Sequence, residues 1–118
     1  MDDRYERGRA RFLEIHDAKA LAAVEGLGEL GRLIVEFVYG DVYTRAALSD
    51  RDRELAAVAS LVALGRSSQL PQHLRAALAA GLTEEELRET IIQTAAIAGF
   101  PPAMNAMSTL RTIVSERG

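Results

Sequence analysis

The 118-residue sequence has no cysteine and few aromatic residues, which make up only 5% of the chain. Without cysteine the protein has no disulfide, no thiolate metal site and no thiol redox chemistry. No apolar stretch approaches the roughly 18 residues that span a bilayer, and the N-terminal segment MDDRYERGRARF lacks the apolar core of a signal peptide. We therefore expect a cytoplasmic protein with no membrane partner.

Basic runs and phosphate-binding motifs are also missing. The net charge is −3, charges of both signs are mixed along the chain, and no basic cluster is combined with an aromatic platform. No glycine-rich phosphate loop, HExxH motif or acidic cluster at ligand spacing occurs, and no nucleophile-elbow motif supports a serine hydrolase. We expect no nucleic-acid partner, no metal ion and no other cofactor.

What the sequence does contain is helical patterning over one domain, residues 1–118. Apolar residues make up 48% of the chain, many of them alanine, and no run alternates as strands do. Thr83 and Glu86 form a capping box, a typical helix start. Residues 18–28 are a weak segment broken by glycine. Capping and stop signals predict an all-α fold with about six helices, at residues 3–15, 29–43, 49–64, 68–80, 83–98 and 101–116.

The predicted helix at residues 29–43 has the clearest apolar face. Its large apolar residues are spaced as i, i+3, i+4 and i+7, which places them on one side of an α-helix. These residues are Leu30, Leu33, Ile34 and Phe37. We predict that this side is buried.

Of the two histidines, His73 is the better candidate for chemistry. It lies between Leu70 and Leu74 on the apolar side of a short helix, and from that position alone an inert, hydrogen-bonded core histidine is the simpler interpretation. If the helix includes Arg66, then Arg66, Gln69 and His73 project from one side. Histidine moves protons near neutral pH and arginine offers a planar fork, so together they predict a pocket for a small carboxylate.

Glu54 abuts the buried side of its predicted helix, four residues before Val58, and a buried carboxylate needs a partner. A salt bridge or partial exposure of Glu54 is as good an interpretation as a role in the site. In a simple antiparallel hairpin, Glu54 would lie about 9 Å along the helix axis from the level of His73. We expect the two residues to meet only if their helices cross steeply or if a second subunit contributes.

Four further polar residues and a second histidine are candidates with weaker signals. Tyr39 and Tyr43 are four residues apart and share a helix face, which more often marks a core edge than a substrate wall. Arg45 follows them. Asn105 stands among apolar residues and needs a hydrogen-bond partner if it is buried. His16, among charges at a helix end, is interpreted as a solvated side chain or a C-cap.

The stretch from Gln72 to Met107 reads QHLRAALAAGLTEEELRETIIQTAAIAGFPPAMNAM. It resembles the carboxymuconolactone decarboxylase family, and the residues that carry the resemblance are His73, Ala77, Gly81, Thr83, Glu85, Glu86, Leu87, Ala95, Gly99, Pro101 and Ala103. Upstream, EFVYGDVYTRAALSDRDREL is similar to the family segment that contains Trp-Gly-Glu-Val-Trp and a following arginine. The resemblance extends over nearly the whole chain.

This resemblance implies an alkylhydroperoxidase-D-like helical fold, assembly into a homotrimer or homohexamer, and cofactor-free decarboxylation of 4-carboxymuconolactone to the β-ketoadipate enol-lactone. A sister branch of the family places C-x-x-C-x-x-x-H before the same histidine. Arg66 and Gln69 occupy those two cysteine positions, so thiol peroxidase chemistry is excluded. The sister branch also has a glutamate upstream of its first cysteine, and Glu54 matches it.

Gln69 departs mildly from the family pattern, where decarboxylases often have glutamate, and three other residues depart more strongly. Tyr39 and Tyr43 stand where the family has tryptophan, and Ile97 stands where its decarboxylases commonly have tyrosine. Each change alters the wall of the expected pocket. The departures therefore bear on the substrate rather than on the fold.

These residues lead to the hypothesis of a decarboxylase that acts on a small lactone carboxylate. His73 would donate or shuttle the proton, Glu54 would hold its tautomer, and Arg66 or Arg45 would anchor the carboxylate or the lactone oxygen. The other expected substrate-binding residues are Gln69, Tyr39, Tyr43 and Asn105. The alternatives are an isomerase, cyclase or lactone hydrolase on the same scaffold, or a non-enzymatic oligomer that binds small acids.

Overall fold

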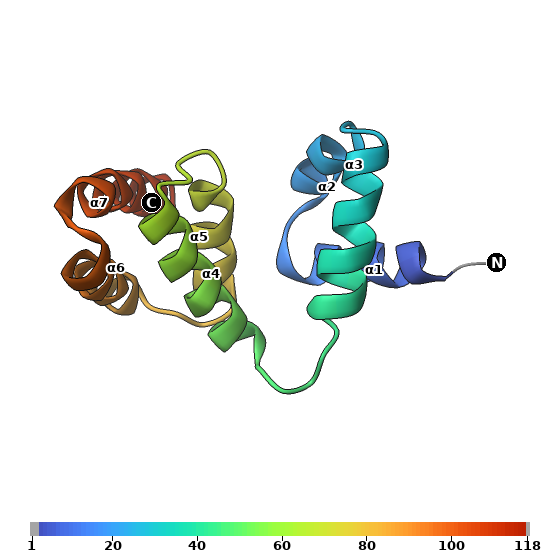
Figure 1. Ribbon diagram of the computed structural model, residues 1–118, viewed down its shortest axis with the longest axis horizontal. Helices are drawn as coiled ribbons and strands as arrows, with labels where there is room; N and C mark the ends of the chain where they lie inside the picture. The colour runs from blue at the N-terminus through green and yellow to red at the C-terminus, as the bar shows by residue number, and fades with distance from the viewer. Residues whose placement is uncertain (1–2, 118) are drawn as a thin grey trace. The chain divides into compact units, whose positions relative to one another are not determined.

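The structure is a computed structural model, and it describes residues 3–117. The chain forms two compact units that divide between Ser49 and Asp50 (Figure 1). Within the described residues the regular structure consists of seven α-helices and one π-helix. The all-α prediction is confirmed, with seven α-helices in place of about six, while the single domain over residues 1–118 stays a prediction.

Unit 1, up to Ser49, begins with two α-helices, α1 (Arg4–Ile15) and α2 (Ala18–Glu25). The second arises from the segment that the sequence marks as weak. Asp17 explains this helix, because its carboxylate accepts a hydrogen bond from the backbone N–H of Ala20 at 2.8 Å. This N-cap therefore stabilises the start of a segment whose alanines favour a helix.

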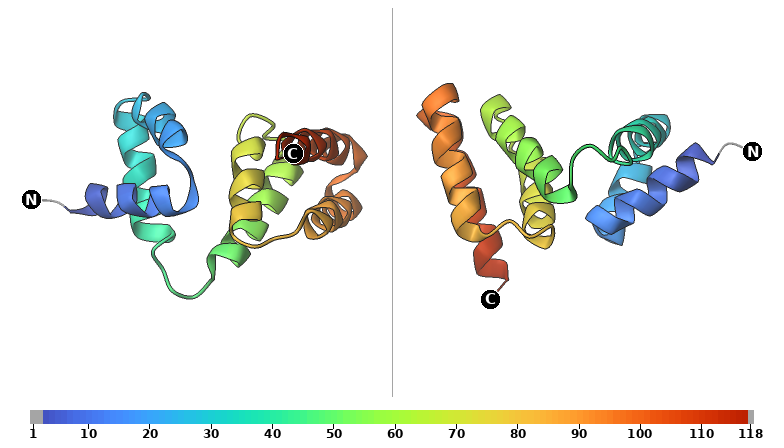
Figure 2. Two further views of the ribbon diagram at one scale, coloured as in Figure 1. Left: turned by 180° about the vertical axis from the view of Figure 1, so that it is seen from behind. Right: turned by 90° about the horizontal axis from the view of Figure 1, so that it is seen from below.

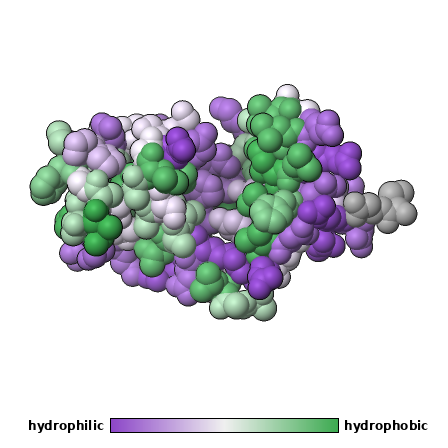
Figure 3. All heavy atoms as spheres, viewed as in Figure 1, coloured by the Kyte–Doolittle hydropathy of each residue, from purple (hydrophilic) through white to green (hydrophobic). Residues whose placement is uncertain are grey.

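The predicted helix at residues 29–43 is instead a short α3 (Glu29–Leu33) that continues into the π-helix η1 (Ile34–Val42). The prediction of its buried face is wrong. Leu30, Leu33 and Phe37 are 59%, 55% and 58% exposed, and Figure 3 shows hydrophobic side chains gathered over this helix. The prediction chose the side with the large apolar residues, whereas the side that packs inside unit 1 is the one that carries Gly31 and Gly40. The buried residues are Gly31, Val35, Glu36, Tyr39 and Gly40.

Helix α1 lies across η1, as the two views in Figure 2 show. The contact is backbone to backbone. A Cβ atom added to Gly8 would lie 2.1 Å from the carbonyl oxygen of Val35, and one added to Gly40 would lie 2.9 Å from that of Arg4. The small core of unit 1 forms beside this crossing and contains Phe12, Leu21, Val35 and Tyr39.

Unit 2, from Asp50, contains α4 (Asp50–Leu64), α5 (Leu70–Ala79), α6 (Glu84–Ala98) and α7 (Phe100–Glu116). These helices lie close to the predicted ranges, and the capping box of Thr83 and Glu86 is confirmed. All four helices contribute to one aliphatic core, whose buried members include Val58, Leu74, Leu87 and Leu110. None of the helices between residues 3 and 117 is long and apolar enough to cross a membrane.

Candidate active site

His73 and Glu54 form a direct contact within one chain. The Nδ1 atom of His73 lies 2.8 Å from Oε1 of Glu54. The glutamate side chain is 1% exposed and the histidine side chain 17% exposed, so the pair has one buried member and one member that reaches the surface. The hydrogen bond confirms that Glu54 has a partner, as its burial requires.

The simple hairpin register that separates the two residues does not describe α4 and α5. Between the helices lie residues 65–69, beginning with Gly65, which has a φ of +70°. These residues are not extended: the N–H of Arg66 donates to the carbonyl oxygen of Leu61, and that of Leu70 to the carbonyl oxygen of Arg66. The contact between His73 and Glu54 is made within one chain, so no second subunit is needed for it.

The contact holds the imidazole of His73 in place. The hydrogen bond between Nδ1 of His73 and Oε1 of Glu54 links the ring to a buried carboxylate and fixes its orientation. A histidine oriented by a carboxylate is a common arrangement for general acid–base chemistry.

Arg66 and Asn105 come together at a different place in unit 2. They line a small hollow of about 20 Å³, enough for one or two water molecules. The remaining lining residues are Leu61, Val62, Gly65, Ser67, Leu70, Pro102, Ala106 and Thr109. Neither His73 nor Glu54 lines the hollow, but Leu70, one turn before His73 on α5, does.

No single helix carries Arg66, Gln69 and His73 on one side, contrary to the prediction. Helix α5 begins at Leu70, which leaves Arg66 in the preceding connection and Gln69 at the N-cap position. Both Arg66 and Gln69 are exposed, and their backbones form a turn in which the N–H of Gln69 donates to the carbonyl oxygen of Arg66 at 3.3 Å. Asn105 is exposed as well, so its side chain does not need a partner inside the protein.

The remaining predicted site residues belong to unit 1. Tyr39 is buried, and its ring stacks on that of Tyr43 with 4.9 Å between the centroids and 28° between the planes. Tyr43 is half-buried at the end of η1, and Arg45 follows in an exposed turn. The tyrosine at 39 is therefore a core residue, while the one at 43 marks the edge of that core.

The sequence reasoning missed the position of His16. Its backbone N–H caps α1 by donating to the carbonyl oxygen of Phe12, as one of the two interpretations expects. Its side chain is buried, however, with Nε2 at 2.9 Å from the hydroxyl of Tyr39 and the ring 4.9 Å from that of Phe12. The spacing of four residues between an aromatic ring and a histidine was the available signal.

A second missed feature is a row of arginines on α1. Arg4 and Arg7 both bind the carboxylate of Asp41, with Arg4 Nε at 3.0 Å, and Arg7 also donates to the carbonyl oxygen of Gly40 at 2.9 Å. The hydrogen bond from Arg4 lowers the pKa of Asp41 below its ordinary 3.8. Arginines at positions 4, 7 and 11 share one helix face, which was the sequence signal. Residues 3–117 contain no group of three side chains suited to hold a metal ion.

Sequence comparisons identify proteins that are similar to this chain. Residues 28–112 match the model of the carboxymuconolactone decarboxylase family. The chain is 31% identical over 122 residues to 4-carboxymuconolactone decarboxylase of Acinetobacter baylyi, which covers 99% of this chain and 91% of that protein. It is 29% identical over 84 residues to nitrosuccinic acid decarboxylase of Metarhizium robertsii, covering 71% and 59% of the two chains. An uncharacterized 15.0 kDa protein of Paracoccus denitrificans is 29% identical over 85 residues, covering 70% and 63%.

Proposed function

The chain belongs to the carboxymuconolactone decarboxylase family, and we propose that it is a decarboxylase acting on a small lactone carboxylate such as 4-carboxymuconolactone. The observation that carries the proposal is the contact of 2.8 Å between His73 and the buried Glu54. Two relatives with different substrates in their names share the decarboxylase reaction, which supports the reaction class more strongly than it supports one substrate.

In the proposed reaction, the bond from the ring carbon to the carboxylate breaks and CO₂ leaves. The bonding electron pair is delocalised toward the lactone carbonyl as a dienolate, so the substrate itself is the electron sink. The doubly protonated imidazole of His73 then delivers the Nε2 proton to carbon and remains protonated on Nδ1, where Glu54 accepts its hydrogen bond. Solvent returns the proton to Nε2 for the next turnover, and no redox or carrier group is consumed.

Two arginines and two side-chain amides are the proposed polar binding groups. Arg66 and Arg45 are the proposed anchors for the substrate carboxylate or the lactone oxygen, because a guanidinium offers a planar fork of donors. The hollow beside Arg66 is too small for a lactone, which means that the substrate would lie over this arginine rather than inside the hollow. Gln69 and Asn105 offer exposed amides for hydrogen bonds.

The two tyrosines take unequal parts in the proposed site. Tyr39 is 4% exposed and its hydroxyl is bonded to His16, so we assign it to the support of Tyr43 rather than to substrate contact. Tyr43 is half-buried, which leaves part of its side chain available to a ligand. A smaller ring than the family's tryptophan at this position gives a wall of different shape.

The test is release of CO₂ from 4-carboxymuconolactone by the wild type and by His73→Ala. We expect turnover by the wild type and a loss of about 10²–10⁴-fold in kcat for the variant, the usual contribution of a positioned acid or base. Arg75→Gln is the matched control, because Arg75 lies on the same helix, is exposed and pairs with Glu116 away from the site.

The outcomes separate the candidate functions. Full activity of His73→Ala contradicts the mechanism, and a wild type that binds the lactone without converting it indicates a binding protein. Conversion to an isomer, a cyclised product or a ring-opened acid, with no loss of CO₂, indicates one of the other enzyme classes. Mass spectrometry of the products distinguishes all of these results.

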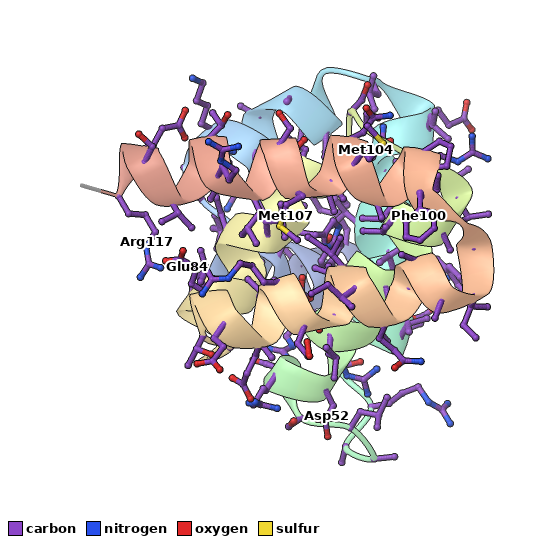
Figure 4. The ribbon with its side chains drawn as sticks, turned by 90° about the vertical axis from the view of Figure 1, so that its left-hand side faces the viewer. Asp52, Glu84, Phe100, Met104, Met107 and Arg117 are labelled. Atoms are coloured by element: carbon purple, nitrogen blue, oxygen red, sulfur yellow. The ribbon has the colours of Figure 1, made fainter. Side chains whose placement is uncertain are left out.

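The proposal includes self-association into a homotrimer or homohexamer. Ile97, Phe100 and Met104 are strongly exposed near the junction of α6 and α7, while Met107 packs between these helices (Figure 4). Exposed apolar side chains that lie close together often mark a contact surface. Light scattering measures the mass directly, and a monomer at all concentrations would contradict this part of the proposal.

A further inference from the structure

The hollow in unit 2 is lined by a cation and by polar side chains with unused donors. Arg66, Ser67 and Asn105 line it, and their side chains form no hydrogen bond or ion pair with another residue between 3 and 117. Thr109 also lines it, but its hydroxyl already donates to the carbonyl oxygen of Asn105 at 3.0 Å. No acidic side chain of the described range lines the hollow. Donors and a positive charge without an acid suit a bound anion.

Arg66 differs in this respect from three other arginines of unit 2, which bind carboxylates of the chain itself. These pairs are Arg51 with Glu86, Arg75 with Glu116 and Arg88 with Glu84. The guanidinium of Arg66 is available to a carboxylate from outside, and its planar fork of N–H donors matches the two oxygens of that group.

The size of the hollow limits what the anion can be. Its volume of about 20 Å³ holds one or two water molecules. Each oxygen of a carboxylate is about as large as a water molecule, whereas a lactone ring or a tetrahedral phosphate is larger. The hollow therefore fits a carboxylate group whose parent molecule lies outside it.

The hollow lies one helical turn from His73. Leu70 lines it, and His73 follows three residues later on the same side of α5, about 4.5 Å along the helix axis. The histidine side chain is 17% exposed, so a ligand can reach it. A single small molecule can therefore place a carboxylate in the hollow and another of its atoms beside the imidazole.

The charge of Arg66 determines which carboxylate suits the hollow. The substrate of the proposed reaction, 4-carboxymuconolactone, has two carboxylates, of which one leaves as CO₂ and the other stays. Negative charge moves off the departing group in the transition state, so a cation at that group stabilises the ground state more and slows the reaction. The carboxylate that stays keeps its charge, and a cation there binds substrate, transition state and product alike.

We propose that Arg66, Ser67 and Asn105 form a subsite for the carboxylate that the substrate retains, one helical turn from His73. The inference rests on the proposed function for the reaction and the substrate. It defines the substrate class as acids that carry a second carboxylate beside the one that leaves, and it gives Ser67 a binding role. The hollow then sets the affinity for substrate and product, while His73 transfers the proton.

Carboxylate binding is measured first without turnover, with acetate as the probe. In NMR spectra of the arginine side chains, the Nε–H resonance of Arg66 is assigned by its absence from Arg66→Met. We expect acetate to shift this resonance with saturation, and phosphate at the same ionic strength to shift it little, because phosphate exceeds the hollow. Arg75 is the control, since it lies on α5 and pairs with Glu116. A shift without saturation, or an equal shift at Arg75, overturns the proposal.

The kinetic part uses 4-carboxymuconolactone, with Arg75→Met as the matched control for Arg66→Met. Arg66→Met should raise KM about tenfold, the size expected for one hydrogen bond to a charged group, and should raise the inhibition constant of the lactone product by the same factor. The value of kcat should stay near that of the wild type, because only uniform binding is lost. A large fall in kcat would place Arg66 at the developing oxyanion, and a rise would place it at the departing carboxylate. Either result, or an unchanged KM, overturns the proposal.

The two neutral donors should have smaller effects. Ser67→Ala and Asn105→Leu each remove one hydrogen bond to the carboxylate and should raise KM and the product inhibition constant about threefold. Both residues are exposed, and guanidine denaturation checks that each variant is folded. Unchanged constants in both variants contradict the proposed subsite.

Failure of the proposed function gives a different pattern. A wild type that releases no CO₂ contradicts that function, whereas the acetate titration still decides whether the hollow binds a carboxylate. Decarboxylase activity without a saturable acetate shift at Arg66 supports the proposed function and contradicts the subsite.

Discussion

In unit 2 all four helices contribute aliphatic side chains to one core, whereas in unit 1 the main helix pair meets backbone to backbone at Gly8 and Gly40. Unit 1 compensates for its small apolar core with directed polar contacts, such as those from Arg7 and Arg11 to carbonyl oxygens. Side-chain volume therefore stabilises one unit, and the close fit of two backbones stabilises the other.

The difference also separates two kinds of functional group. Unit 2 holds the pair of His73 and Glu54, with the carboxylate buried. Unit 1 holds the stacked pair of Tyr39 and Tyr43, whose placement depends on hydrogen bonds from α1. The proposed proton transfer thus lies on the unit with the larger core.

The largest effect on stability is expected from Leu74→Ala in unit 2. Leu74 is fully buried, so the substitution leaves a cavity and should lower the free energy of unfolding by about 2–5 kcal/mol. Leu64→Ala is the matched control, because Leu64 is exposed and should change stability by less than about 0.5 kcal/mol. Equilibrium denaturation measures the free energy of unfolding of both variants. Equal losses of stability would contradict the role assigned to the aliphatic core.

Gly8→Ala should have the next largest effect on stability. It also destabilises the protein, but by adding an atom to a filled contact rather than by leaving a cavity. The added Cβ would lie 2.1 Å from the carbonyl oxygen of Val35, so α1 and η1 must move apart, at a cost of about 1–3 kcal/mol. Ala10→Ser, at an exposed position of the same helix, is the control. Amide hydrogen exchange should show lost protection in residues 4–42, and normal protection there would contradict the backbone contact.

Lowering the pH should have a smaller effect on stability, through protonation of one carboxylate in each unit. The pKa of Asp41 is lowered from 3.8 by the hydrogen bond from Arg4, and that of Glu86 is lowered from 4.5 by the backbone N–H of Thr83, with Arg51 adding to the effect. A folded pKa below the unfolded one means that the stabilisation is present above the ordinary value and is lost as pH falls through the folded value.

This pH effect separates the two units experimentally. We expect Asp41→Asn to remove part of the acid sensitivity of hydrogen exchange in residues 4–42 only, and Glu86→Gln to remove part of it in α6 only. The comparison is made as pH falls from above 4.5 to below 3.8. A change in the acid response of the other unit would contradict this separation.

Sequence reasoning was successful where large apolar residues determine the fold. The helices of unit 2 follow from caps and apolar spacing, as the Thr83 box shows. In unit 1 the same reasoning assigned Leu30, Leu33 and Phe37 to a buried face, because it chose the helix side with the largest apolar residues. The π-helix and the glycine crossing depend on how two backbones meet, which local spacing does not encode.

The candidate site was only partly predictable for a similar reason. His73 and Glu54 were identified from residue chemistry and resemblance, but the assumed hairpin register hid their contact, which depends on how α4 and α5 pack. His16 was misjudged since its partner, Tyr39, lies far along the chain. Partners distant in sequence are settled by packing, and a single sequence contains little information about them.

The central claim is that Glu54 acts through His73, and a double-mutant cycle in kcat for 4-carboxymuconolactone tests it most directly. Glu54→Gln keeps the shape of the side chain and removes its charge, while His73→Ala removes the proton donor. The account predicts that Glu54→Gln is impaired and that the double variant is as slow as His73→Ala alone, because the glutamate has no effect once the imidazole is gone. Full activity of Glu54→Gln, or a double variant slowed by the product of the two single losses, would contradict it.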